Sequence, residues 1–123
     1  MGLRQSREPE FRGEDSAAHF ILIEYCGGWG YYKHAAAVAD RVEAKYAGKF
    51  RFELRSDTGT TGRCEVTIFA NSKAQAETGG ILVHSKANGQ GIPSKGWEQF
   101  DQRLDDVVAK LWSHGLYMLN TKY

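Results

Sequence analysis

Two cysteines, Cys26 and Cys64, are the residues of this sequence best suited to redox chemistry. Cys26 directly follows the apolar run of residues 19–25 and precedes two glycines, Gly27 and Gly28. A thiol between a buried strand and the start of a helix lies where backbone N–H groups and the helix dipole favour the thiolate. The glycines leave room for a partner thiol or disulfide. This position makes Cys26 a candidate redox residue, and the alternative is a buried strand-end thiol without reactivity.

Cys64 stands in a different pattern, since it alternates with Val66 and Ile68 in a strand-like run. That alternation places its side chain toward the core. Cys64 is nonetheless a possible second thiol for Cys26, provided that the fold brings the two Cα atoms within about 7 Å of each other.

The sequence gives no support to several other kinds of site. The histidines have no metal-ligand spacing, so we expect no metal site; they are His19, His34, His84 and His114. The glycine-rich segment after the first apolar run lacks the spacing and the acidic partner of a nucleotide-binding loop. With 16 basic and 15 acidic side chains the formal net charge is +1, which gives no general attraction to nucleic acid.

Four strands are expected to position these residues. Residues 19–25 are apolar and β-branched, which is typical of a strand buried on both faces. Residues 50–55 alternate apolar and charged side chains, as a half-buried strand does. Residues 64–69 and 81–85 predict a third and a fourth strand, joined as a hairpin.

Two helices complete the predicted domain. Apolar positions from Ala35 to Tyr46 recur at helical spacing, and Gly48 stands where a helix C-cap is expected. A second apolar face runs from Trp97 to Leu111. The order β-α-β-β-β-α predicts an α/β fold, in which two helices pack on a mixed four-stranded sheet and the first two strands are parallel.

The 123 residues amount to one domain. Residues 1–18 are rich in charged side chains and show no apolar face, so we expect a flexible N-terminal tail. Residues 19–115 are expected to form the folded domain, followed by a C-terminal tail at residues 116–123. Within the domain, residues 71–80 are expected to form a long hairpin loop.

The cellular location is predicted from what the sequence lacks. It has no apolar run long enough for a signal peptide or a membrane span, and two cysteines do not make a secreted disulfide framework. The first six residues match the N-myristoylation pattern at Gly2, although so short a pattern also arises by chance. We therefore expect a cytoplasmic protein that contacts a membrane only if Gly2 is myristoylated.

Three motifs in order resemble the selenoprotein W family. Residues 23–31 are similar to its strand-loop-helix signature, in which a cysteine and a selenocysteine or second cysteine flank two residues. Residues 61–67 resemble its threonine-glycine loop and following strand, and residues 82–91 resemble its last hairpin. The resemblance extends from about His19 to Leu111. It implies a thioredoxin-like fold, a thiol or selenol redox role linked to glutathione as co-substrate, no bound cofactor and, in some relatives, binding of partners such as 14-3-3.

The sequence departs from this signature at Trp29, which stands at the selenocysteine or cysteine position. Two interpretations stay open. Selenocysteine is encoded by UGA, which differs from the tryptophan codon UGG in one base, so Trp29 could stand for selenocysteine. Alternatively Trp29 is a true substitution, and an indole cannot form a disulfide or a selenenylsulfide.

The two interpretations of Trp29 predict different functions. With selenocysteine at position 29, the protein is a small oxidoreductase whose redox pair is Cys26 and that residue. With tryptophan, Cys26 is a lone thiol that can still be glutathionylated or oxidised to a sulfenic acid. This case favours the alternative function, a redox-sensing or redox-inactive interaction module that binds a partner such as 14-3-3 through this loop. In both cases the loop is supported by residues that the resemblance picks out, Gly27, Gly28, Gly30, Thr61 and Gly62.

Overall fold

The computed structural model describes residues 8–28, 30–70 and 80–121, with the exception of the side chains of residues 114–121. Its strands are β1 (Glu10–Arg12), β2 (His19–Tyr25), β3 (Phe50–Ser56), β4 (Cys64–Phe69) and β5 (Ile81–Ser85). Its helices are α1 (Tyr32–Lys45) and α2 (Trp97–Thr121), with short helical turns η1 (Lys86–Gln90) and η2 (Pro93–Gly96) between β5 and α2.

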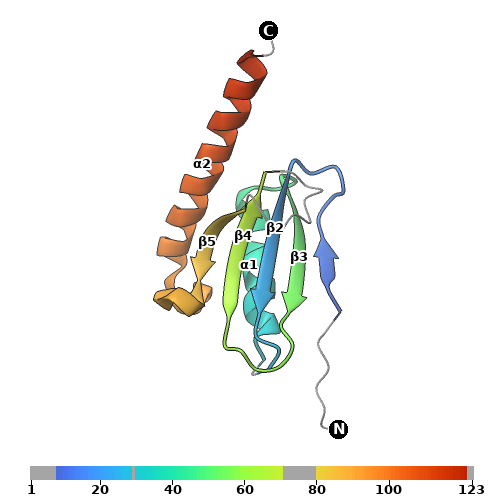
Figure 1. Ribbon diagram of the computed structural model, residues 1–123, viewed down its shortest axis with the longest axis vertical. Coiled ribbons are helices and arrows are strands. Elements are labelled where there is room, and N and C mark those ends of the chain that lie inside the picture. The colour runs from blue at the N-terminus through green and yellow to red at the C-terminus, as the bar shows by residue number, and fades with distance from the viewer. Residues whose placement is uncertain (1–7, 29, 71–79, 122–123) are drawn as a thin grey trace.

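The strands form one mixed sheet in the order β1-β3-β2-β4-β5 (Figure 1). β2 and β3 are parallel and are joined through α1, whereas all other neighbouring pairs are antiparallel. The predicted α/β class, its thioredoxin-like architecture and its parallel crossover are confirmed. The prediction of four strands was wrong, because the described part of the chain contains a fifth, β1.

The additional strand lies inside the segment predicted to be a flexible tail. β1 pairs antiparallel with β3, with Glu10 opposite Leu54. Arg12 ties it further to α1, since its guanidinium lies 3.0 Å from the Asp40 carboxylate and donates to the Tyr32 hydroxyl at 3.3 Å. Such an edge strand depends on backbone hydrogen bonds and ion pairs rather than on an apolar face. Hydrophobic periodicity therefore gave no sign of it.

The core lies between one face of the sheet and the helices. Figure 1 shows α1 behind the sheet and α2 beside β5. Alternate residues of β2 point into this core, which includes Ile21, Ile23 and Tyr25. Burying these side chains is the main stabilising contribution, at about 25 cal/mol per Å² of apolar surface. The packing fixes the position of the carboxyl end of β2, where Cys26 follows.

Helix α2 is longer than predicted. It continues to Thr121 and so includes most of the segment 116–123 that was expected to be a tail. The prediction ended the helix at its last apolar position on the core face, but no proline interrupts the backbone after it. Among the described residues, no helix combines the length and the apolar character needed to cross a membrane.

Candidate functional site

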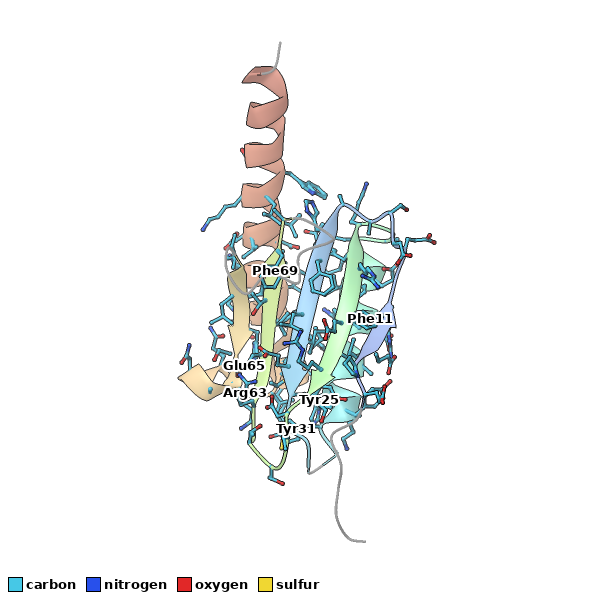
Figure 2. The ribbon with its side chains drawn as sticks, turned by 45° about the vertical axis from the view of Figure 1, so that its right-hand side comes forward. Phe11, Tyr25, Tyr31, Arg63, Glu65 and Phe69 are labelled. Carbon is cyan, nitrogen blue, oxygen red and sulfur yellow. The ribbon has the colours of Figure 1, made fainter. Side chains whose placement is uncertain are left out.

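Cys26 lies directly after β2, at the end of the sheet where Figure 2 labels Tyr25, Tyr31 and Arg63. Its backbone N–H donates a hydrogen bond to the carbonyl oxygen of Arg63 at 2.8 Å. The N–H of Gly27 donates to the carbonyl of Gly59 at 2.9 Å. The segment after β2 is therefore bound along its length to the loop between β3 and β4.

The approach of these two segments requires glycine at position 27. A Cβ on Gly27 would lie 2.6 Å from the carbonyl oxygen of Gly59 and closer still to that of Asp57. Backbone atoms cannot move aside as a side chain can, so a larger residue would push the segments apart. Gly28 differs, because a Cβ there would meet the side chain of Thr60.

The turn into α1 follows within a few residues. The N–H of Tyr31 donates to the carbonyl of Gly28 at 3.3 Å, and Gly30 has a φ of +68°. That left-handed conformation is open to glycine at little cost. Trp29 falls outside the described residues, so its interpretation as the second redox position stays a prediction. The same holds for the lipidation candidate Gly2.

The Cys26 thiol is surrounded by hydrogen-bond donors. Its side chain is buried, with the residue 1% exposed, and the N–H of Gly28 lies 3.4 Å from Sγ. Burial raises the pKa of this thiol, but hydrogen bonds from the backbone of Gly62, Gly28 and Thr61 outweigh it. The resulting pKa lies below the ordinary value for cysteine. These donors favour the thiolate, which is the nucleophilic form.

An ion pair closes the loop that supplies two of those donors. The Arg63 guanidinium donates to both carboxylate oxygens of Asp57, at 3.0 Å from Nε and 2.7 Å from Nη2. The Thr61 hydroxyl donates to the same carboxylate at 2.6 Å. Burial raises the pKa of Asp57, but the bonds from Arg63 and Thr61 outweigh it and hold that pKa below its usual value. Asp57 is thus ionised at neutral pH.

Asp57 and Arg63 were not predicted from the sequence as parts of the site. A signal was present, because an acidic and a basic residue flank the segment 58–62 that contains the threonine-glycine pair. Opposite charges across so short a loop can pair and close it. Thr61 and Gly62, which the resemblance did pick out, are the residues that this pair encloses.

Cys64 lies close to Cys26 in the fold, on the strand that neighbours β2. β4 pairs antiparallel with β2, and Cys64 is opposite Tyr25, the residue that precedes Cys26. It is completely buried. Burial and the neighbouring Glu65 raise the pKa of its thiol to about 12. Both cysteines are free thiols in the structure. Cys64 is therefore near the site in the fold but is held in the unreactive thiol form.

Aromatic and basic side chains border the other side of the turn. Tyr31 is buried and packs edge-on against His34, with ring centroids 5.1 Å apart. The Lys86 ammonium lies 6.0 Å from the Tyr31 ring centre. Tyr31 therefore supports the turn from within rather than offering an exposed aromatic surface.

Comparison with known proteins agrees with this arrangement. The model of the Rdx family matches residues 20–113, which is most of the chain. The chain belongs to the Rdx family. It is also similar to selenoprotein W of Gallus gallus, with 28% identity over 91 residues that cover 74% of this chain and 89% of that protein. Membership of the Rdx family indicates a redox function of the thioredoxin-like kind. Cys26, Trp29, the supporting loop and Cys64 all lie within the matched segment.

Proposed function

We propose that this Rdx-family protein is a small thiol oxidoreductase that acts through Cys26 and uses glutathione as its co-substrate. The observation that carries the proposal is the set of backbone donors around Sγ, supplied by Gly28 on one side and by Thr61 and Gly62 on the other. Preorganised N–H donors stabilise the negative charge of a thiolate in a site that excludes water.

The proposed reaction uses one protein thiol and consists of two thiol–disulfide exchange steps. The Cys26 thiolate attacks the glutathione sulfur of a glutathionylated substrate, so that an S–S bond to Cys26 forms and the substrate leaves as a thiolate that takes up a proton. A second glutathione thiolate then attacks the glutathione sulfur of this mixed disulfide. Glutathione disulfide leaves and the Cys26 thiolate is restored. The net result is that the substrate is reduced and two glutathione molecules end as one disulfide.

Selenocysteine at position 29 would add a second route. Its selenolate would be the attacking nucleophile, and Cys26 would resolve the adduct by closing a selenenylsulfide across Gly27 and Gly28. The codon at position 29 distinguishes the routes. UGA with a selenocysteine insertion element supports the two-residue route, whereas UGG leaves Cys26 as the single redox residue.

The burial of Cys26 favours a second candidate function. Because the residue is 1% exposed, a disulfide reaches Sγ only when the surrounding loops move. A thiol that reacts slowly suits a redox-sensing or redox-inactive module, in which the Cys26 loop binds a protein partner of the 14-3-3 kind. Under this alternative, the purified chain binds such a partner. A redox-inactive module binds it with the same affinity whether or not Cys26 carries glutathione, whereas the affinity of a redox-sensing module changes when Cys26 is glutathionylated.

The test of the main proposal is the exchange reaction itself. The protein is incubated with glutathione disulfide, and the intact mass and peptide masses are measured. We expect one glutathione adduct, located at Cys26 and removed by reduced glutathione. Cys64→Ala should give the same adduct, and Cys26→Ser should give none. A Cys26 thiol that remains fully available to alkylation after the incubation would contradict the proposal.

A further inference from the structure

The carboxylate of Asp57 holds the loop beside Cys26 in place through several hydrogen bonds. It accepts hydrogen bonds from Arg63 and from the Thr61 hydroxyl, and the N–H of Asp57 donates to the carbonyl of Tyr25 at 2.7 Å. Asp57 therefore connects the end of β2 to both ends of the segment 61–63. Its side chain is mostly buried, at 12% exposed, which strengthens charge-assisted hydrogen bonds compared with a surface pair.

Residues 61–63, which these hydrogen bonds hold, are the part of the loop that faces the Cys26 thiol. Thr61 and Gly62 supply hydrogen bonds to Cys26, and the carbonyl of Arg63 accepts the Cys26 N–H at 2.8 Å. Gly62 has a φ of +71°, a left-handed conformation that glycine adopts at little cost. Because glycine can also adopt other conformations, contacts at the two ends of the loop determine its path. The direction in which these N–H groups point therefore depends on the Asp57 contacts.

We propose that Asp57 is a positioning residue for Cys26, because its carboxylate holds Thr61 and Arg63 so that the loop donors face Sγ. This inference rests on the proposed role of Cys26 as the redox thiol. Asp57 does not touch the reacting sulfur in this scheme. It acts through Thr61, whose single hydroxyl proton goes to the carboxylate and whose oxygen accepts the N–H of Arg63 at 3.3 Å.

The proposal makes a prediction opposite to that of simple electrostatics. A carboxylate near a thiol repels the thiolate, so removing its charge should lower the pKa of the thiol. If Asp57 instead acts by positioning the loop N–H donors toward Sγ, its removal should raise the pKa of Cys26. The sign of the change therefore decides between the two roles. The charged groups gathered at this corner of the fold come from β2, β4, the loop between β3 and β4, and η1; they are Glu24, Glu65, Asp57, Arg63 and Lys86.

The experiment measures the thiolate of Cys26 by ultraviolet absorbance as a function of pH in the full chain, with Cys26→Ser as the blank. Asp57→Ala should raise the midpoint by about one pH unit, and Asp57→Asn, which keeps one acceptor oxygen, by less. Glu24→Gln is the matched control. It removes a carboxylate that lies 3.5 Å from Arg63, and it should not raise the midpoint.

Two measurements keep the result interpretable. Circular dichroism and the continued resistance of Cys64 to alkylation show that each variant is folded, and if Asp57→Ala is not folded, Asp57→Asn decides. A midpoint that falls, or stays unchanged, in the folded Asp57 variants would overturn the inference. The proposed function fails separately, when the wild-type protein forms no adduct with glutathione disulfide whatever its thiolate midpoint.

Discussion

Cys26 and Cys64 are two thiols at the same end of the sheet, both buried, and yet their acidities are shifted in opposite directions. The pKa of Cys64 is raised to about 12, because burial and Glu65 disfavour its thiolate. The pKa of Cys26 is lowered although burial acts on it in the same sense. The difference lies in the donors, since Cys26 has left the strand and receives hydrogen bonds from two loops. Cys64 lies inside β4, where neighbouring strands use the backbone donors.

The opposite pKa shifts of these two buried thiols show that burial alone does not decide whether a cysteine is reactive. A buried thiol with apolar neighbours is inert, whereas a buried thiol at a strand end can be ionised by backbone N–H groups. The two environments lie close together in the fold. Tyr25 of β2 pairs with Cys64 of β4, and Cys26 is the residue that follows Tyr25.

The largest expected effect is the loss of glutathione exchange when the reactive thiol is removed. Cys26→Ser should give no measurable glutathione adduct, because the sequence then retains one thiol and that thiol is not ionised at neutral pH. Cys64→Ala should retain the adduct while lowering the free energy of unfolding by about 1–2 kcal/mol through the cavity it leaves. Adduct formation is measured by mass spectrometry and stability by denaturant titration. An adduct of equal yield in Cys26→Ser would remove the contrast.

A second effect concerns the relative rates of the two thiols in the folded protein. The thiolate fractions implied by a pKa of about 12 for Cys64 and a lowered pKa for Cys26 differ widely at neutral pH. Alkylation by iodoacetamide should therefore modify Cys26 at least about a hundredfold faster than Cys64. Peptide mass spectrometry over time gives both rates in one sample. Equal rates would mean that the loop donors do not act on Cys26.

Glycine substitutions test the close approach of the loops. Gly27→Ala should lower the free energy of unfolding by about 1–3 kcal/mol and slow Cys26 alkylation, because its Cβ meets the carbonyls of Asp57 and Gly59. Gly28→Ala is the matched control. Its Cβ meets the Thr60 side chain, which can rotate, so we expect a smaller loss of stability. Urea unfolding of both variants provides the measurement, and a larger loss in Gly28→Ala would contradict the described packing.

Removal of one side-chain donor should have a smaller effect. Thr61→Val keeps the shape of the side chain but removes the hydroxyl that holds Thr61 to Asp57. The backbone donors of Thr61 and Gly62 are then less well placed, so the pKa of Cys26 should rise. We expect alkylation at neutral pH to slow by about threefold to tenfold. Thr61→Ser should restore the wild-type rate. A slow Thr61→Ser variant would show that the methyl group, not the hydroxyl, supports the site.

The smallest effect is the dependence of stability on Asp57 ionisation. Since the folded-state pKa of Asp57 lies below its ordinary value, the stabilisation is complete above about pH 4 and is lost as pH falls through the folded-state value. The difference in unfolding free energy between wild type and Asp57→Asn should accordingly shrink on acidification. Denaturant titrations at several pH values measure it. A difference that grows toward acid would reverse the assigned direction.

The sequence predicted the parts of this site that depend on periodicity. The apolar run before Cys26 and the alternation around Cys64 were enough to place one thiol at a strand end and the other in the core. Strand β1 was not predicted, because three edge residues carry almost no hydrophobic signal. The pairing of Asp57 with Arg63 was not predicted either. It depends on the path of the loop after β3, which the parallel register of β2 and β3 sets in three dimensions.

The structure implies that the surrounding loops lower the pKa of Cys26 and do not lower that of Cys64. The most direct test is the ultraviolet titration of the thiolate in the wild-type protein, Cys26→Ser and Cys64→Ala. The structure predicts an ionisation with a midpoint below the ordinary value for cysteine, absent in Cys26→Ser and unchanged in Cys64→Ala. An ionisation that appears only above the ordinary value, or that persists in Cys26→Ser, would contradict it.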